Sequence, residues 1–91
     1  MSSQESELRA FFADPTNYAH KPIEDVVRSL GPATYNDDWD WGRYIYGWEQ
    51  PNLRFIVVTR GGYVTAAEEL DPHDTTRFGT TLRVLWGNSS P

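Results

Sequence analysis

Residues 39–70 constrain the fold of this chain more than any other segment. Three consecutive runs rich in β-branched and aromatic residues predict strands over residues 42–49, 53–60 and 63–70. Between the last two runs, the Gly61-Gly62 pair favours a two-residue hairpin, because the central residues of such turns adopt positive φ. Strands joined by turns this short pair antiparallel, so the sequence predicts an antiparallel sheet.

Two short helices are expected before this sheet. The first covers residues 4–13, where apolar residues recur at helical spacing, and it ends before Pro15. The second begins at Pro22, which suits the first helical position, and Gly31 terminates it. Its apolar residues fill the i, i+3, i+4 and i+7 positions, which predicts one face packed on the sheet.

The rest of the chain completes the predicted domain. Residues 33–40 are expected to form a loop, and residues 80–86 a fourth strand. A length of 91 residues corresponds to a single domain, residues 1–91, with loose tails at 1–3 and 88–91. The predicted fold class is α+β, with two N-terminal helices packed on a four-stranded antiparallel β-sheet.

The Gly61-Gly62 turn also predicts the two faces of the sheet. It pairs Arg60 with Tyr63, and strict alternation then pairs Arg54 with Glu69. The more apolar face is expected to lie on the helices, and it contains Leu53, Phe55, Val57, Thr59, Val64, Ala66, Glu68 and Leu70. The other face is expected to meet solvent, and it contains Arg54, Ile56, Val58, Arg60, Tyr63, Thr65, Ala67 and Glu69.

The strand over residues 42–49 carries a concentration of aromatic rings whose direction depends on the next turn. If residues 50–52 form a three-residue turn, Tyr44, Tyr46 and Trp48 lie on the solvent face with the arginines. If the turn has four residues, every side chain of that strand changes face and the rings enter the core. The sequence leaves both registers open.

The charge of the chain limits its partners. It has 13 acidic and 8 basic residues, a net charge of −5, and no concentrated basic patch. This composition disfavours nucleic acid and favours another protein with a basic surface. Asp37, Asp38 and Asp40 form an acidic cluster that is suited to such a partner. Because the EF-hand spacing and its closing Glu are absent, a solvated loop is favoured over a calcium site.

No catalytic set is apparent in the sequence. His73 lies between Asp71 and Asp74, but no motif places a nucleophile beside it, so a turn is favoured over a general base. With no cysteine and two histidines, no metal or cofactor is indicated. The lack of cysteines, of an apolar leader and of a membrane-length apolar run predicts a cytoplasmic protein without a membrane partner.

Part of the pattern resembles a known group of folds. The run Ile-Glu-Asp-Val-Val-Arg-Ser-Leu-Gly-Pro is followed by an aromatic strand and then by Leu-Arg-Phe-Ile-Val-Val-Thr-Arg-Gly-Gly-Tyr-Val. Residues 22–70 thereby resemble the BamE/SmpA and β-lactamase-inhibitor-protein fold group. The resemblance implies two short helices with an antiparallel sheet, and a habit of binding proteins through the sheet or loops.

The chain also departs from that group. Pro32 follows Gly31 directly, one residue earlier than in the group's motif. The lipid-bearing Cys of the BamE branch and the disulfides of the inhibitor branch are both absent, because the chain has no cysteine. Outer-membrane assembly and β-lactamase as a target are therefore not carried over.

These observations predict a non-enzymatic protein-binding module, with an inhibitor or immunity-type protein as its specific form. Tyr, Trp and Arg are enriched at binding hot spots, which favours an aromatic and arginine sheet face as the binding site. The predicted binding residues are Tyr44, Tyr46, Trp48, Arg54, Arg60, Tyr63, Asp37, Asp38 and Asp40. Two alternatives remain: a small-molecule or enzyme-accessory domain with an aromatic-lined pocket of about 300 Å³ or more, and a homodimer joined through the aromatic face or the edge of the last strand.

Overall fold

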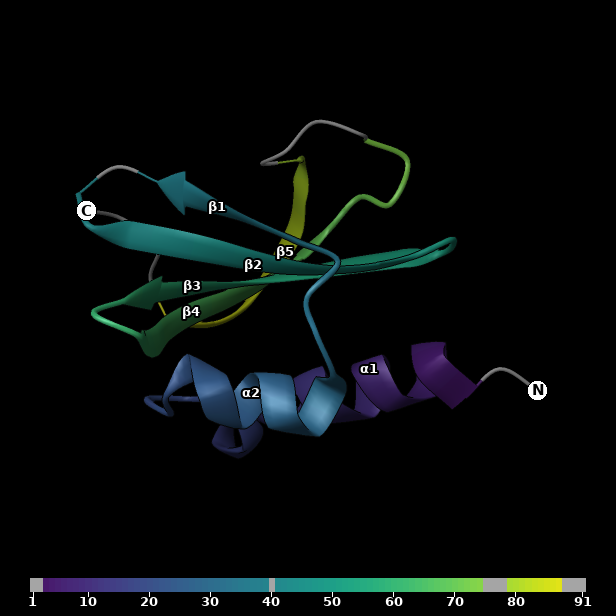
Figure 1. Cartoon of the computed structure of the whole chain (residues 1–91). Helices are drawn as coiled ribbons and strands as arrows, with labels where there is room; N and C mark the ends of the chain where they lie inside the picture. The colour runs from purple at the N-terminus through teal and green to yellow at the C-terminus, as the bar shows by residue number, and fades with distance from the viewer. Residues whose placement is uncertain (1–2, 40, 75–78, 88–91) are drawn as a thin grey trace.

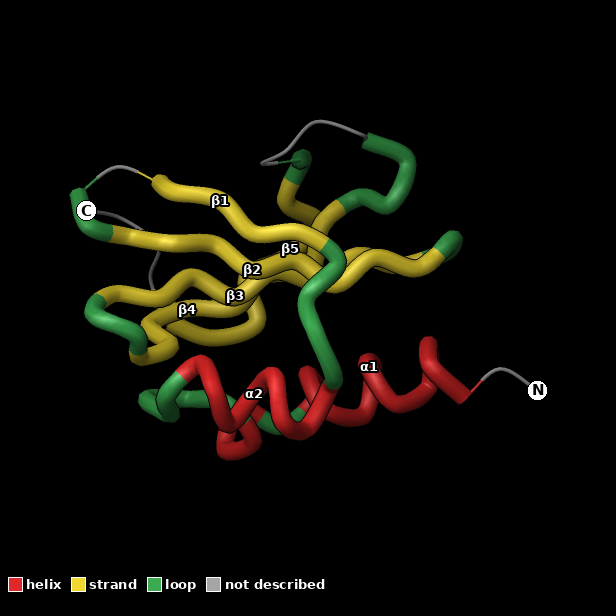
Figure 2. The backbone as a smooth tube through the Cα atoms, viewed as in Figure 1, coloured by secondary structure: helices red, strands yellow, loops and turns green. Residues whose placement is uncertain are grey.

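The computed structural model describes residues 3–39, 41–74 and 79–87. Figure 1 shows both helices against one face of a single antiparallel sheet, and Figure 2 shows the strands of that sheet in yellow. The five strands follow the order β1-β2-β3-β4-β5. The elements are α1 (Ser3–Ala13), the 3-10 helix η1 (Pro15–Asn17), α2 (Ile23–Leu30), β1 (Tyr35–Trp39), β2 (Arg43–Gln50), β3 (Leu53–Arg60), β4 (Tyr63–Leu70) and β5 (Thr81–Gly87). The α+β class and the two N-terminal helices are confirmed.

The prediction of four strands was wrong by one, because β1 occupies residues expected to form a loop. β1 pairs with β2 from Tyr35 opposite Gly47 to Trp39 opposite Arg43. Its sequence, YNDDW, has little intrinsic strand propensity. The ring of Tyr35 occupies the space where a side chain at Gly47 would stand. The glycine thus admits a large ring on the neighbouring strand, and this cross-strand packing compensates for the weak local preference.

The end of α2 follows its sequence signals. Gly31 adopts φ 87°, a conformation open to glycine, and its N–H donates to the Val27 carbonyl at 2.7 Å. At the other end, the Ile23 N–H donates to the Gly62 carbonyl at 2.8 Å. The helix is therefore joined at its first residue to the turn between β3 and β4.

The main core lies between the helices and the sheet. Phe12 of α1 stacks on Phe55 of β3 with ring centroids 4.5 Å apart. At the end of α2, the Gly31 carbonyl accepts a hydrogen bond of 3.2 Å from the Trp48 indole of β2. The buried residues of this core are Leu8, Phe12, Tyr18, Ile23, Val26, Trp48, Leu53, Phe55, Val57, Val64 and Ala67.

The register between β2 and β3 differs from both predicted alternatives. Gln50 pairs with Leu53, so the turn contains two residues, and Trp48 consequently pairs with Phe55. A turn one residue shorter than the three-residue form moves every β2 side chain to the other face. The predicted solvent position of Trp48 was therefore wrong: it is 4% exposed and lies in the main core. Tyr46 is half-buried against the same core, while Tyr44 is 43% exposed.

The register between β3 and β4 is as predicted at the turn but not beyond it. Arg60 pairs with Tyr63 and Thr59 with Val64, and the register then shifts between Thr59 and Val58, leaving Thr65 without an opposite residue. Arg54 consequently pairs with Leu70, so the predicted pairing of Arg54 with Glu69 was wrong. A bulge of this kind inserts one residue and exchanges the faces of the strand residues beyond it. Three residues predicted to face the helices lie on the other side instead: Ala66, Glu68 and Leu70.

The face of the sheet away from the helices is also covered. Its buried cluster contains Ile45, Ile56, Val58, Ala66 and Leu70, with Tyr35 packed against it. Arg54, which was predicted to face solvent, is 2% exposed on this side. In Figure 1, β1 and residues 71–74, which follow β4, lie on the side of the sheet away from the helices. The prediction of a solvent-exposed face was therefore wrong for its central residues.

Candidate binding surface

Exposed aromatic side chains lie at the end of the sheet where two turns join β1 to β2 and β3 to β4. Arg43, Arg60 and Tyr63 occupy one row of the register, so the β1–β2 and β3–β4 turns lie at the same end of the sheet. Trp41, in the β1–β2 turn, is 70% exposed, and Tyr63 is 56% exposed. We call Trp41, Tyr44, Arg60 and Tyr63 the hairpin-end surface; Tyr44 projects from the helix side of the sheet, and Arg60 and Tyr63 project from the other side.

Trp41 combines exposure with an unfavourable backbone. Its φ is 70°, in the left-handed region that large side chains rarely adopt, while the adjacent Gly42 adopts φ 73° without that cost. Such a residue in a turn costs roughly 1–2 kcal/mol, which the surrounding structure has to offset. Non-glycine residues in this region cluster at functional sites, which makes Trp41 a candidate site residue.

Backbone hydrogen bonds fix the other side of the hairpin-end surface. The His20 N–H donates to the Val64 carbonyl at 3.2 Å, and the Val64 N–H donates to the Lys21 carbonyl at 2.9 Å. Because both the N–H and the carbonyl of Val64 are hydrogen-bonded, the phenol of the neighbouring Tyr63 projects from a rigid position. Rigid aromatic side chains lose little conformational entropy on binding.

The hairpin-end surface continues toward Tyr46. The rings of Tyr44 and Tyr46 lie 6.1 Å apart in a tilted arrangement, and Asp38 of β1 pairs with Tyr44. Burial raises the pKa of the Tyr46 phenol, and the neighbouring Tyr44 and Glu24 raise it further. The Tyr46 hydroxyl is therefore a neutral group at physiological pH.

The structure separates the residues that the sequence grouped as one site. Tyr44, Arg60 and Tyr63 belong to the hairpin-end surface, with Asp37 and Asp38 on the adjacent strand β1. Trp48 and Arg54 are buried on opposite sides of the sheet, and Asp40 lies outside the described residues. The sequence-based prediction missed Trp41 as a site residue. An aromatic residue directly before a turn glycine was the available signal.

Arg54 holds the far side of the sheet together rather than facing a partner. Its Nε and Nη2 groups donate to the Tyr35 hydroxyl at 3.1 and 2.7 Å, and its Nη1 donates to the Asp74 carbonyl at 2.5 Å. The Glu49 carboxylate lies 3.2 Å from its Nε. These contacts connect β1, β2, β3 and the segment after β4 through one buried cation.

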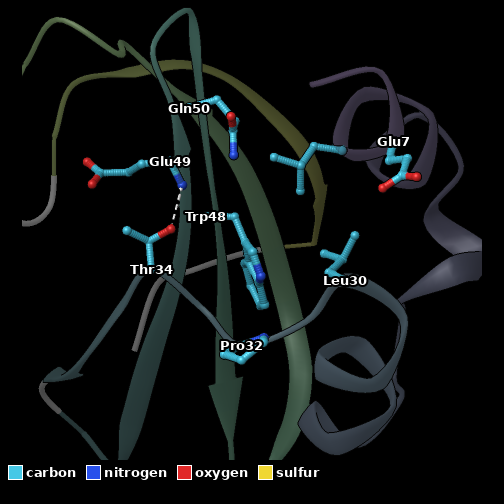
Figure 3. A pocket seen from close by; sticks show the side chains of 8 residues that line it. Glu7, Leu30, Pro32, Thr34, Trp48, Glu49 and Gln50 are labelled. Atoms are coloured by element: carbon cyan, nitrogen blue, oxygen red, sulfur yellow. Dashed lines mark hydrogen bonds between the residues drawn. The ribbon is translucent and has the colours of Figure 1, made fainter. Parts of the chain in front are cut away.

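A first cavity lies between β2, the middle of α1 and the end of α2. It measures about 210 Å³ and is lined by Glu7, Leu8, Leu30, Pro32, Thr34, Trp48, Glu49 and Gln50. Figure 3 shows Trp48 and Gln50 on one side and Leu30 and Glu7 on the other, with the Glu49 carboxylate directed away. The Glu49 N–H instead donates to the Thr34 hydroxyl at 3.0 Å, the contact dashed in Figure 3.

A second cavity of about 240 Å³ lies between α1 and β5. Drug-sized ligands occupy sites of about 300–1,000 Å³. Both cavities are smaller than that range, which favours recognition of single side chains over an enclosed small molecule.

The acidic residues around His73 take part in hydrogen bonds of their own turn. The His73 N–H donates to the Asp71 carboxylate at 2.9 Å, and the Asp74 carboxylate accepts a hydrogen bond of 2.6 Å from the Thr80 hydroxyl, so these acids stabilise the turn. Within residues 3–39, 41–74 and 79–87, no group of three His, Cys or acidic side chains is arranged to hold a metal. Neither helix in those ranges combines the length and the apolar character needed to cross a bilayer.

Comparison with protein-family models, with curated proteins and with solved structures finds no match to this chain. The resemblance to the BamE/SmpA and β-lactamase-inhibitor-protein fold group therefore stays a prediction. The function has to be argued from the geometry of the chain itself.

Proposed function

We propose that this domain is a non-enzymatic protein-binding module that contacts its partner through the hairpin-end surface. The observation that carries the proposal is Trp41, a largely exposed tryptophan held in the left-handed region at a hairpin tip. The Trp41 side chain belongs to neither buried cluster of the core, whereas aromatic anchors are enriched at binding hot spots. Tyr44 and Tyr63 are further exposed aromatic residues at the same end of the sheet.

Charge favours a partner with a basic surface. The chain carries a net charge of −5, and Asp38 is exposed next to Tyr44 at the edge of the hairpin-end surface. Acidic side chains around an aromatic centre raise the association rate with a basic partner more than they raise affinity. An inhibitor or immunity-type protein that blocks a basic surface is the specific form of this proposal.

The test is capture of the partner from the native host with matched baits. We expect the wild-type domain to retain a protein that Trp41→Ala fails to retain, because loss of a central tryptophan costs about 2 kcal/mol or more of binding free energy. Arg28→Ala is the control, since Arg28 is an exposed residue on α2 and belongs to neither the turn nor the β5 edge. Both variants are expected to unfold at the wild-type denaturant concentration. Equal capture by the wild type and Trp41→Ala would exclude the hairpin-end surface as the binding site.

A further inference from the structure

The groove between α1 and β5 forms a second site with its own chemistry. The cavity of about 240 Å³ has an apolar floor made by Phe12, Phe55 and Leu85. Phe12 and Phe55 are stacked and almost fully buried, so the floor is rigid. A hollow of this size and lining suits one apolar side chain rather than a larger ligand.

Two arginines flank this apolar floor. Arg9 is exposed, and no hydrogen bond or ion pair joins its side chain to another described residue. Arg83 donates from Nε to the Glu69 carboxylate at 2.8 Å, a contact that leaves its two Nη groups available for a ligand. In a chain of net charge −5, two guanidinium groups beside the single Glu69 carboxylate leave an excess of positive charge next to the apolar hollow. It suits an anion attached to an apolar group.

The backbone beside the groove is also suited to a ligand. β5 is the last strand of the sheet, so its outer edge has no strand partner among the described residues. Leu82 and Val84 are 56% and 58% exposed there, and the strand contains no Lys or Pro of the kind that protects an edge. An extended segment can therefore add to this edge through main-chain hydrogen bonds.

We infer that the α1–β5 groove binds the C-terminal segment of a partner polypeptide whose last side chain is apolar. The segment adds to β5 as a strand, its terminal carboxylate lies between Arg9 and Arg83, and its last side chain enters the hollow. A strand edge, an anion site and an apolar hollow are the three elements that such a terminus requires, and the groove brings them together. This inference does not depend on the hairpin-end surface.

The test uses a short peptide with a free or a blocked terminus. Acetyl-Thr-Val-Thr-Val-Leu with a free carboxylate is titrated into the domain and followed by backbone amide NMR shifts. We expect shifts at β5 and α1, and affinity about tenfold lower for the same peptide ending in an amide, because the charge-assisted contacts are lost. Replacing the last Leu by Gly should weaken binding by a similar factor, since the hollow then stays unfilled.

Variants of the domain separate the carboxylate contact from general charge effects. Arg9→Gln should bind the free-acid peptide about tenfold more weakly and lose its preference over the amide. Arg28→Gln is the matched control, because Arg28 is exposed on α2 and pairs only with Asp25 among the described contacts. Trp41→Ala should bind the peptide like the wild type, so failure of the hairpin-end proposal and failure of this one are distinguishable.

Several outcomes would overturn the inference. They are equal affinity for the amide and the free acid, an unchanged affinity in Arg9→Gln, and the absence of saturable binding at millimolar peptide. Hexanoate serves as a further probe. If hexanoate bound as tightly as the peptide, the strand-pairing part would be wrong, and the groove would be a site for small carboxylates.

Discussion

Removing one hydroxyl from the far face of the sheet should destabilise the whole domain. In Tyr35→Phe, the buried Arg54 loses the acceptor that it contacts through Nε at 3.1 Å and Nη2 at 2.7 Å. Hydrogen bonds to charged groups contribute about 1.5–3 kcal/mol each, and Arg54 is too buried for water to replace the acceptor fully. Because the Glu49 and Asp74 contacts remain, we expect a loss of about 3 kcal/mol of unfolding free energy.

A double-mutant cycle tests whether this loss comes from the Arg54 contact. Arg54→Met removes the cation, so the Tyr35 hydroxyl no longer has that donor to satisfy. In that background, Tyr35→Phe should cost under about 1 kcal/mol, which gives a coupling energy of about 2 kcal/mol.

Urea denaturation followed by circular dichroism measures all four free energies. Tyr63→Phe is the control, because Tyr63 is exposed and its hydroxyl should contribute within about 0.5 kcal/mol. Additive losses in the cycle, or a wild-type midpoint for Tyr35→Phe, would show that the buried cation does not hold the far face together.

Three further predictions concern stability. Gly47→Ala should cost about 3 kcal/mol in urea denaturation, because the new methyl group overlaps the Tyr35 ring; a loss under about 1 kcal/mol would mean that β1 moves away freely. Trp48→Phe should cost about 2 kcal/mol, since it leaves a gap in the core and removes the indole hydrogen bond at the end of α2; an unchanged midpoint would contradict the observed register. Burial raises the pKa of Tyr18, Tyr35 and Tyr46 above 10.0, the ordinary value. The three phenols therefore make their full contribution to the free energy of unfolding below pH 10, and that contribution declines as the pH rises through their folded-state pKa values. Denaturation between about pH 9 and 12 should show this decline, and Tyr18→Phe should reduce its slope; a flat profile would refute the argument.

The local elements of this fold could be predicted from the sequence. The end of α2 at Gly31 and the turn at Gly61-Gly62 depend on backbone conformations that few residues other than glycine adopt. The glycines in the sequence therefore identify both features directly. The apolar spacing of α2 identified its buried face in the same way. In each case the physical cause lies within a few residues of the element itself.

The faces of the sheet could not be predicted in the same way. One residue of turn length before Leu53, and one extra residue at Thr65, reversed the faces of β2 and of most of β4. Local sequence favours neither alternative strongly, because both are decided by packing against distant residues. β1 shows the same limit, since its pairing depends on the room that Gly47 leaves for Tyr35.

The candidate site was foreseen only where exposure did not depend on register. Arg60 and Tyr63 flank the glycine turn and are exposed as expected. Arg54 was expected in solvent because alternation from the glycine turn assigned it to the less apolar face, opposite Glu69. The groups that accept its hydrogen bonds in the buried site, a phenol from β1 and a carbonyl after β4, are distant in sequence, and no local sequence pattern predicts them.

Coverage of both sheet faces limits where this domain can bind. The helices cover one face, and Ile45, Val58 and Leu70 are fully buried on the other. Docking therefore has to use turns and edges, so substitutions there should change binding while leaving unfolding nearly unchanged, and substitutions on the faces should change stability first. Tyr44 lies at the border between these regions, partly exposed and in contact with the half-buried Tyr46. Of the predicted binding residues, Tyr44 is the one whose replacement by Ala should lower both the partner affinity and the unfolding free energy. A change in affinity alone would assign Tyr44 to the surface, and a change in unfolding free energy alone would assign it to the core.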